Sequence, residues 1–158
     1  MFEDLLNNTK WAECLESDLE DVAASVECDS VDIKEAAGVI FSINAGAITW
    51  SPDGTDKLGL VLQDSADDSV WADVTDESVV QFKISDTITA MEDATTGLLK
   101  MIDAAGDADK LYSAQYVGQK RFARILLEHH GTITTIDIGV TSVVFGLSRA
   151  GASGVIGS

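Results

Sequence analysis

Alternating side chains in residues 110–128 restrict the folds open to this chain more than any other feature. Apolar side chains occupy every second position in the first half of this segment, and Val117-Gly118 ends that run. The second half repeats the alternation after Gln119 and Lys120. A period of two on both sides of a glycine turn indicates two paired β-strands. The alternating apolar positions are Tyr112, Ala114, Tyr116, Ala123, Ile125 and Leu127.

Other short apolar segments recur about every 8 to 15 residues, with turn residues between them. Pro52 is the only proline, and its Pro-Asp-Gly context predicts a tight turn. The polar segment 85–96 is expected to be a loop. We therefore predict an all-β fold, an antiparallel β-sandwich or jelly roll of about eight strands. The segments with a strand-like pattern, from which these strands are expected to form, are 31–33, 38–45, 58–63, 70–74, 79–84, 98–102, 110–117, 122–128, 132–138 and 141–147.

The two ends of the chain differ in pattern from this middle part. Apolar residues near the N-terminus recur every three or four positions, which favours a helix over about residues 10–24, with Trp11 and Leu15 on one face. An extended arm that reaches a partner is the alternative. The last residues are rich in Gly and Ser, as in flexible segments. The expected organisation is a helical segment or arm at 1–30, a sandwich at 31–148 and a flexible tail at 149–158.

The formal charge of −17 excludes some partners and leaves others open. Such a charge opposes binding to nucleic acid and to anionic membranes. Residues 1–37 hold 11 acidic and 2 basic residues, whereas residues 111–158 hold 2 acidic and 4 basic ones. One interpretation of the acidic composition is that it keeps the protein soluble. The other is that the mildly basic end contacts an acidic neighbour or another copy of the chain. No apolar run approaches the roughly 20 residues of a membrane span, and the first residues do not have the pattern of a Sec signal peptide.

Residues with ligating or catalytic side chains are present, but their spacing does not predict a site. Adjacent histidines on a strand point to opposite faces and do not readily share a metal. The acidic loop lacks the glycine and final glutamate of an EF-hand, so a solvated turn is the expected role rather than a calcium site. The two cysteines are expected to be free thiols. We predict no metal, no cofactor and no catalytic residues, and therefore a protein that is not an enzyme. The residues considered are His129, His130, Asp64, Asp67, Asp68, Cys14 and Cys28.

Lys120, Arg121 and Arg124 form a basic cluster in an otherwise acidic chain. Such a cluster is suited to contact carboxylates on a neighbouring subunit. Pairing with acids of the same chain is the alternative, and the sequence does not decide between the two. A second candidate surface is aromatic. Trp50, Trp71 and Tyr116 would form a platform on which sugars stack, unless these rings belong to the core, as the apolar neighbours of Trp71 suggest.

Three segments carry a resemblance to a known family. They are VIFSINAGAIT at 39–49, LGLVLQDSADDSVWADVTD at 58–76 and YVGQKRFARI at 116–125. In order and pattern these motifs resemble small structural proteins of tailed bacteriophages, the capsid cement or decoration proteins. The resemblance covers roughly residues 31–147.

This resemblance implies a jelly roll that binds the outer surface of an icosahedral head as a homodimer or homotrimer. There it would stabilise contacts between capsomers of the major capsid protein. The protein would be assembled in the host cytoplasm and would end on the virion. The residues expected to bind the partner are Lys120, Arg121, Arg124, Trp11 and Trp50. The alternative function is a glycan-binding sandwich on a virion or cell surface. A third possible function, a hydrolase on a sandwich scaffold, would require a pair of acidic residues clustered in a cleft.

Overall fold

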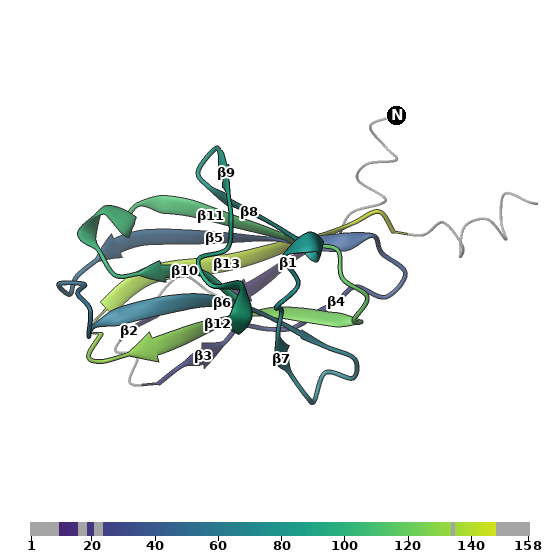
Figure 1. The fold of residues 1–158 in the computed structure, drawn as a ribbon, viewed down its shortest axis with the longest axis horizontal. Coiled ribbons are helices and arrows are strands. Elements are labelled where there is room, and N and C mark those ends of the chain that lie inside the picture. Colours follow the sequence, from purple (N-terminus) through teal and green to yellow (C-terminus); the bar gives the residue numbers. More distant parts are fainter. Residues whose placement is uncertain (1–9, 16–18, 21–23, 134, 148–158) are drawn as a thin grey trace, which may run out of the picture.

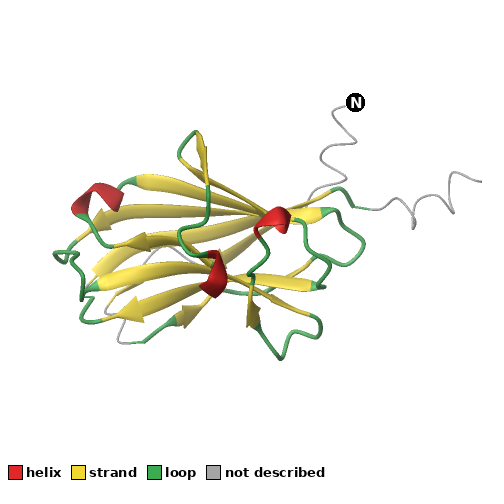
Figure 2. Ribbon diagram, in the orientation of Figure 1, coloured by secondary structure: helices red, strands yellow, loops and turns green. Residues whose placement is uncertain are grey.

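The computed structural model describes residues 10–15, 19–20, 24–133 and 135–147. These residues form two antiparallel β-sheets, which Figure 1 labels strand by strand and Figure 2 shows to account for most of the ribbon. The prediction of an all-β sandwich is confirmed. The strands are β1 (Lys10–Leu15), β2 (Leu19–Glu20), β3 (Val26–Glu27), β4 (Val31–Asp32), β5 (Gly38–Ile48), β6 (Lys57–Ser65), β7 (Ala72–Asp73), β8 (Val80–Ile84), β9 (Thr87–Thr89), β10 (Leu98–Ile102), β11 (Lys110–Tyr116), β12 (Phe122–His130) and β13 (Thr135–Phe145).

Sheet A has seven strands in the order β1-β13-β5-β11-β8-β9, with β2 also paired to β13. Sheet B has six strands in the order β10-β6-β12-β3, with β4 paired to β12 and β7 paired to β6. The long strands β5, β6, β8, β10, β11, β12 and β13 alternate between the two sheets along the chain. The sheets are therefore built from strands that are distant in sequence.

The core lies between the sheets, where every second side chain of each strand points inward. Tyr112 and Tyr116 of β11 are fully buried, as the alternation predicted. The rings of Phe82 and Tyr112 stack with centroids 6.3 Å apart. The Tyr112 hydroxyl donates a hydrogen bond of 2.9 Å to the carbonyl oxygen of Asp107, so this buried polar group is satisfied.

Aspartates shape several of the turns. Asp53 in the Pro-Asp-Gly turn accepts hydrogen bonds from the backbone N–H groups of Thr55 and Asp56, at 2.7 and 2.8 Å. Asp76 and Asp93 cap the two short helices η1 (Glu77–Val79) and η2 (Ala94–Thr96) in the same manner. A third short helix, η3, spans Ala105–Asp107. No helix among the described residues is long and apolar enough to cross a membrane.

Several local predictions need correction. The predicted helix at 10–24 is wrong where the structure describes it, because residues 10–15 form β1 and pair with β13. The sandwich thus includes part of the segment expected to be a separate arm. The strands expected at 132–138 and 141–147 are one strand, β13, and the loop expected at 85–96 contains β9 and η2. Residues 1–9 and the tail expected at 149–158 lie outside the described residues.

Candidate interaction face

The outward side of sheet A is the broadest candidate for contact with another molecule. In β5 the side chains of Phe41 and Ile43 are fully buried, so Ile40 and Ser42 must point away from the core. Directly opposed residues of antiparallel strands share a face, so the strand register continues these two positions across the sheet. The first row consists of Trp11, Val143, Ile40, Gln115 and Gln81. The second row consists of Glu13, Thr141, Ser42, Ser113, Lys83 and Ile88.

These two rows contain few charges. Only Glu13 and Lys83 are ionisable in them, and their charges are opposite. The chain as a whole has a formal charge of −17, so the outward face of sheet A differs sharply from the average surface. Charges return at the end of the face, where Asp137 is exposed. Depletion of charged residues around aromatic and apolar ones is typical of the centre of a protein–protein interface.

Trp11 is the largest exposed apolar side chain of this face, with 69% of its surface accessible. An indole ring is normally at least partly buried, because it is a large apolar group. Trp11 lies on β1, at one edge of sheet A. The half of the face away from β1 has a shallow hollow of about 250 Å³ that extends from β5 across β11 to β8, lined by Ile40, Gln81, Lys83, Ser113 and Gln115.

The predicted basic cluster does not form one surface. Arg121 donates from Nε and Nη2 to the carboxylate of Asp32, with Nη2–Oδ2 at 2.7 Å, and its guanidinium lies 4.8 Å from the ring centre of Phe122. These hydrogen bonds from Arg121 hold the pKa of Asp32 below its usual value. Lys120 is exposed in the same turn. For Arg121, pairing with this chain's own acids is therefore the interpretation that the structure supports.

Arg124 corrects the prediction more strongly, because only 8% of its surface is accessible. Its Nε donates to Gln63 at 3.0 Å and its Nη2 donates to Glu27 at 2.8 Å. The guanidinium also lies 4.2 Å from the ring centre of Trp71, which is half-buried. Gln63 in turn donates to Asp73 at 2.9 Å. Glu27, Arg124, Gln63 and Asp73 form a polar ladder across the outward side of sheet B, in which Arg124 is engaged by this chain's own side chains.

The predicted sugar platform is wrong, because two of its three rings are buried. Trp50 is 9% accessible, and its Nε1 donates to the carbonyl oxygen of Asp56 at 3.1 Å. Trp50 is therefore also removed as a partner-binding residue. Tyr116 is fully buried and donates from its hydroxyl to Asp64 at 2.6 Å, and burial raises the pKa of this phenol. A Cβ at Gly118 would collide with the Tyr116 ring, which explains the glycine in this turn.

The acidic loop after β6 is organised by its own hydrogen bonds. The carboxylate of Asp67 accepts from the backbone N–H groups of Ser69 and Val70, at 3.0 and 3.1 Å. These bonds lower the pKa of Asp67 to about 2. The carboxylate of Asp64 accepts from Tyr116 instead, so the loop does not gather its acids around one point. Among the described residues, no group of three or more His, Cys, Asp or Glu side chains is arranged to hold a metal ion.

Cys14 and Cys28 are both buried free thiols, as predicted. Burial raises the pKa of both, that of Cys28 to about 12. A thiol that stays protonated is a poor nucleophile and a poor metal ligand. These cysteines therefore act as small core residues.

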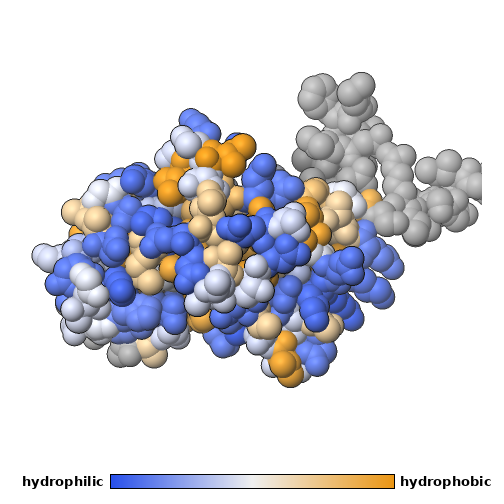
Figure 3. Space-filling model, viewed as in Figure 1, coloured by the Kyte–Doolittle hydropathy of each residue, from blue (hydrophilic) through white to orange (hydrophobic). Residues whose placement is uncertain are grey.

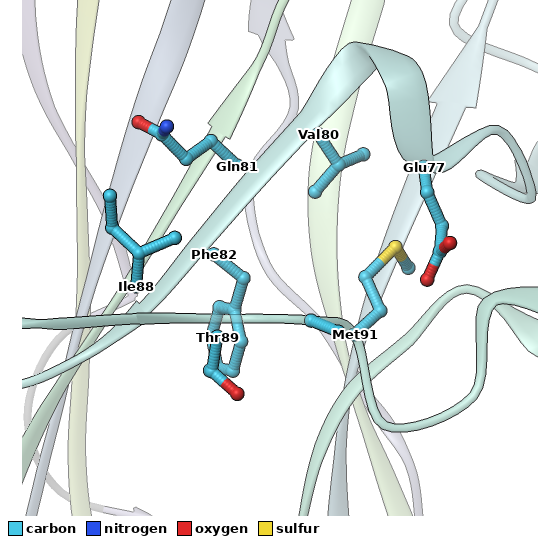
Figure 4. A pocket seen from close by; sticks show the side chains of 8 residues that line it. Glu77, Val80, Gln81, Phe82, Ile88, Thr89 and Met91 are labelled. Carbon is cyan, nitrogen blue, oxygen red and sulfur yellow. The ribbon is translucent and has the colours of Figure 1, made fainter.

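A further pocket, of about 280 Å³, lies where β8 and the residues after β9 approach each other (Figure 4). Its lining is mostly apolar and includes Phe82, Ile88 and Met91. Among the described residues that line it, only Glu77 is ionisable, so the pocket does not bring together an acid and a base. Figure 3 shows small apolar patches at the β8–β9 hairpin and at the loop after β6 on a mostly hydrophilic face.

The structure explains several residues of the motifs found in the sequence. The hydrogen bond from Tyr116 to Asp64 and the contact of Arg124 with Trp71 both connect the motif at 58–76 to the motif at 116–125. The motif at 39–49 supplies most of β5, which lies in the middle of sheet A. These residues hold the sandwich together. In the exposed rows of sheet A, only Ile40 and Ser42 belong to one of these motifs, and Trp11 is the one residue that was expected to bind a partner.

Taken together, the fold and its surface define an antiparallel β-sandwich with one broad, charge-depleted face. No family model matches the chain, and no curated protein matches it. Among solved structures, the SPBc2 prophage-derived protein YomS is similar over 87% of this chain and 92% of its own, with 7% sequence identity and a TM-score of 0.40. A similarity this low does not assign a family. The resemblance to phage decoration proteins therefore stays a hypothesis.

Proposed function

We propose that this chain is a non-enzymatic structural protein of a phage virion, a cement or decoration protein. It binds the outer surface of an icosahedral head and stabilises the contacts between capsomers of the major capsid protein. Its site of action is the capsid surface, and its assembly takes place in the host cytoplasm. Support for the phage head as the partner comes from the resemblance of three motifs to the decoration-protein family, at residues 39–49, 58–76 and 116–125.

The observation that carries the proposal is the outward face of sheet A. This face presents an exposed indole, apolar side chains and uncharged amides and hydroxyls, and only Glu13 and Lys83 are ionisable in its two rows. Such a surface is suited to bind another protein over a wide, flat area. A substrate or a metal would instead require a concave site with converging polar groups. Assembly is therefore the activity that this surface supports best.

The rest of the surface is acidic, and this charge limits the kind of capsid surface to which the protein can bind. A chain with a formal charge of −17 is attracted to a basic surface and repelled by an acidic one. A decoration protein is added to a finished shell, so each copy contributes one interface and the symmetry of the shell multiplies it. We therefore expect the capsid contact to involve the acidic loops and to weaken as salt is added.

The test is to add the purified protein to heads of the parent phage that lack it, and to image the particles by electron cryomicroscopy. The expected result is extra density at symmetry-related positions on the outer surface, with occupancy that falls as the salt concentration rises. An unrelated acidic β-sandwich protein at the same concentration is the control for nonspecific attraction. Absence of bound density at every salt concentration would contradict the proposal.

A further inference from the structure

Two features of sheet A lie at opposite ends of one row. The first row begins with Trp11 on β1 and ends with Gln81 on β8. Trp11 projects into solvent, whereas the side chains around Gln81 and Gln115 leave the hollow of about 250 Å³. A projecting ring thus lies at one end of the face, and a hollow that reaches from β5 to β8 lies in the other half.

The strand order makes these two ends equivalent under a two-fold rotation. In the order β1-β13-β5-β11-β8, strand β5 is in the middle, as Figure 1 allows the reader to follow. Consider an axis parallel to β5 and lying on the outward face of the sheet. Rotation by half a turn about this axis places β1 of a second copy over β8 of the first. Trp11 of each copy then lies over Gln81 of the other, at the margin of the hollow, and its ring can extend from there toward Gln115.

The same two-fold rotation also pairs the charged residues of the second row. Glu13 is at its β1 end, Lys83 is on β8, and Ser42 lies between them on β5. The same rotation brings Glu13 of each copy over Lys83 of the other. The only two ionisable residues of the rows would then form two equivalent ion pairs. Ile88, which is 60% accessible, lies next to Lys83 and would border the incoming Trp11 ring.

We propose that two copies of this chain pack the outward faces of sheet A against each other in a symmetric dimer, with each Trp11 inserted into the hollow beside Gln81 and Gln115 of the other copy. The rotation keeps the strand directions of the two faces nearly aligned, which is the usual arrangement for packed sheets. The same patch on both subunits makes the contact closed, so it ends at two copies.

The size and charge of the face fit this occupant. The five strands β1, β13, β5, β11 and β8 have 6, 11, 11, 7 and 5 residues. At about 3.3 Å per residue and a spacing of about 4.8 Å between strands, they give a face of roughly 600–650 Å². That is at the lower end of the roughly 600–1,000 Å² that each partner contributes to a stable interface. Two molecules that each have a charge of −17 repel each other over most of their surfaces. The face with balanced charges is where two copies meet at the lowest electrostatic cost.

The first experiment measures the mass of the full chain by sedimentation equilibrium over a range of concentrations. We expect a monomer–dimer equilibrium, and we expect Trp11→Ala to raise the dissociation constant by about 30-fold or more, as for an aromatic residue at the centre of an interface. Val70→Ala is the matched control, because Val70 is 74% accessible but lies in the loop between β6 and β7. It should leave the dissociation constant unchanged.

The second experiment tests the symmetry through the charges. Glu13→Lys and Lys83→Glu should each raise the dissociation constant about fivefold to tenfold, because each opposes like charges in two places. The double variant restores the opposite charges and should return the dissociation constant close to its original value. Thermal unfolding of each variant at low concentration shows whether the monomer remains folded.

A monomer at every concentration would overturn the proposal. So would a dimer that Trp11→Ala leaves intact, or a double variant that associates no better than the single ones. None of these measurements requires a capsid. In the dimer the outward face of sheet A is covered by the second copy, so the capsid contact would be made by the acidic loops at its margins. The dimer can therefore fail while the decoration function stands, with sheet A then free to contact the capsid, and the reverse also holds.

Discussion

The outward sides of the two sheets are built in opposite ways. On sheet B, Glu27, Arg124, Gln63 and Asp73 bond to one another, and Trp71 covers the guanidinium. On sheet A, the corresponding rows carry almost no charge, and Trp11 is left exposed. Since both sheets have similar strands, the difference lies in the outward side chains alone. The outward side chains of sheet B are engaged with one another, whereas those of sheet A leave the surface that we propose to be an interface.

Arg124→Ala tests the first half of this comparison and should have the largest effect. It removes the two hydrogen bonds to Glu27 and Gln63 and the contact with Trp71. Glu27 is exposed and can be hydrated, so we expect a loss of about 2–3 kcal/mol in the free energy of unfolding, at the lower end for a broken buried pair. Urea unfolding measures it. Arg121→Ala removes a more exposed pair and should cost clearly less; equal losses would show that the ladder has no special role.

Trp71→Ala should cause the next largest loss in the free energy of unfolding. The indole ring covers the guanidinium of Arg124 at 4.2 Å, and its loss should cost about 1–2 kcal/mol. Trp71→Phe retains an aromatic face and should recover part of that loss. In the Arg124→Ala background, Trp71→Ala should cost less than in the natural chain, since the two side chains act together. Purely additive losses in urea unfolding would count against the coupling.

The acidic loop should make stability depend on pH. Hydrogen bonds lower the pKa of Asp67 to about 2, from a usual value of 3.8. Because the folded pKa is the lower one, the contribution of Asp67 is complete above pH 3.8 and is lost as the pH falls toward 2. In Asp67→Asn this loss disappears, so the fall in melting temperature between pH 4 and pH 2 should be smaller. Asp68→Asn removes the same charge from the same loop and should retain the fall seen in the natural chain.

Gln115→Ala probes the other half of the comparison and should have the smallest effect on the fold. The amide of Gln115 points outward from sheet A and has no side-chain hydrogen bond among the described residues. We expect a change within about 0.5 kcal/mol in the free energy of unfolding, measured where the chain is monomeric. A loss comparable to that of Arg124→Ala would show that this face also stabilises the chain.

The sequence predicts the core well because alternation is a local signal. Ala123, Ile125 and Leu127 are fully buried in β12, and their period of two requires only their own strand. The N-terminal strand was misread for a physical reason. A register shift between Glu13 and Leu15 adds one residue to β1 and breaks its alternation, so the apolar residues there recur with a spacing closer to that of a helix.

The candidate face could not be predicted in the same way. Its rows join Trp11 to Val143 and Ile40, which are far apart in sequence, and only the strand register brings them together. Trp50 shows the converse problem. Trp50 was expected to bind a partner, but its ring is buried and its Nε1 donates a hydrogen bond to the carbonyl of Asp56. Which aromatic ring is exposed is decided by pairing and packing that no single segment encodes.

The position of β13 has a consequence for synthesis. This strand is made last among the described strands, yet it lies between β1 and β5, and β1 pairs with no other described strand. Strand β1, the first of the described strands to be made, must therefore wait for the last of them before it can pair. Such long-range pairing is slow and leaves open sheet edges during translation. A chain that stops before β13 would leave β1 without its partner and one side of β5 exposed, and we expect a message cut short there to yield aggregates rather than a smaller folded product.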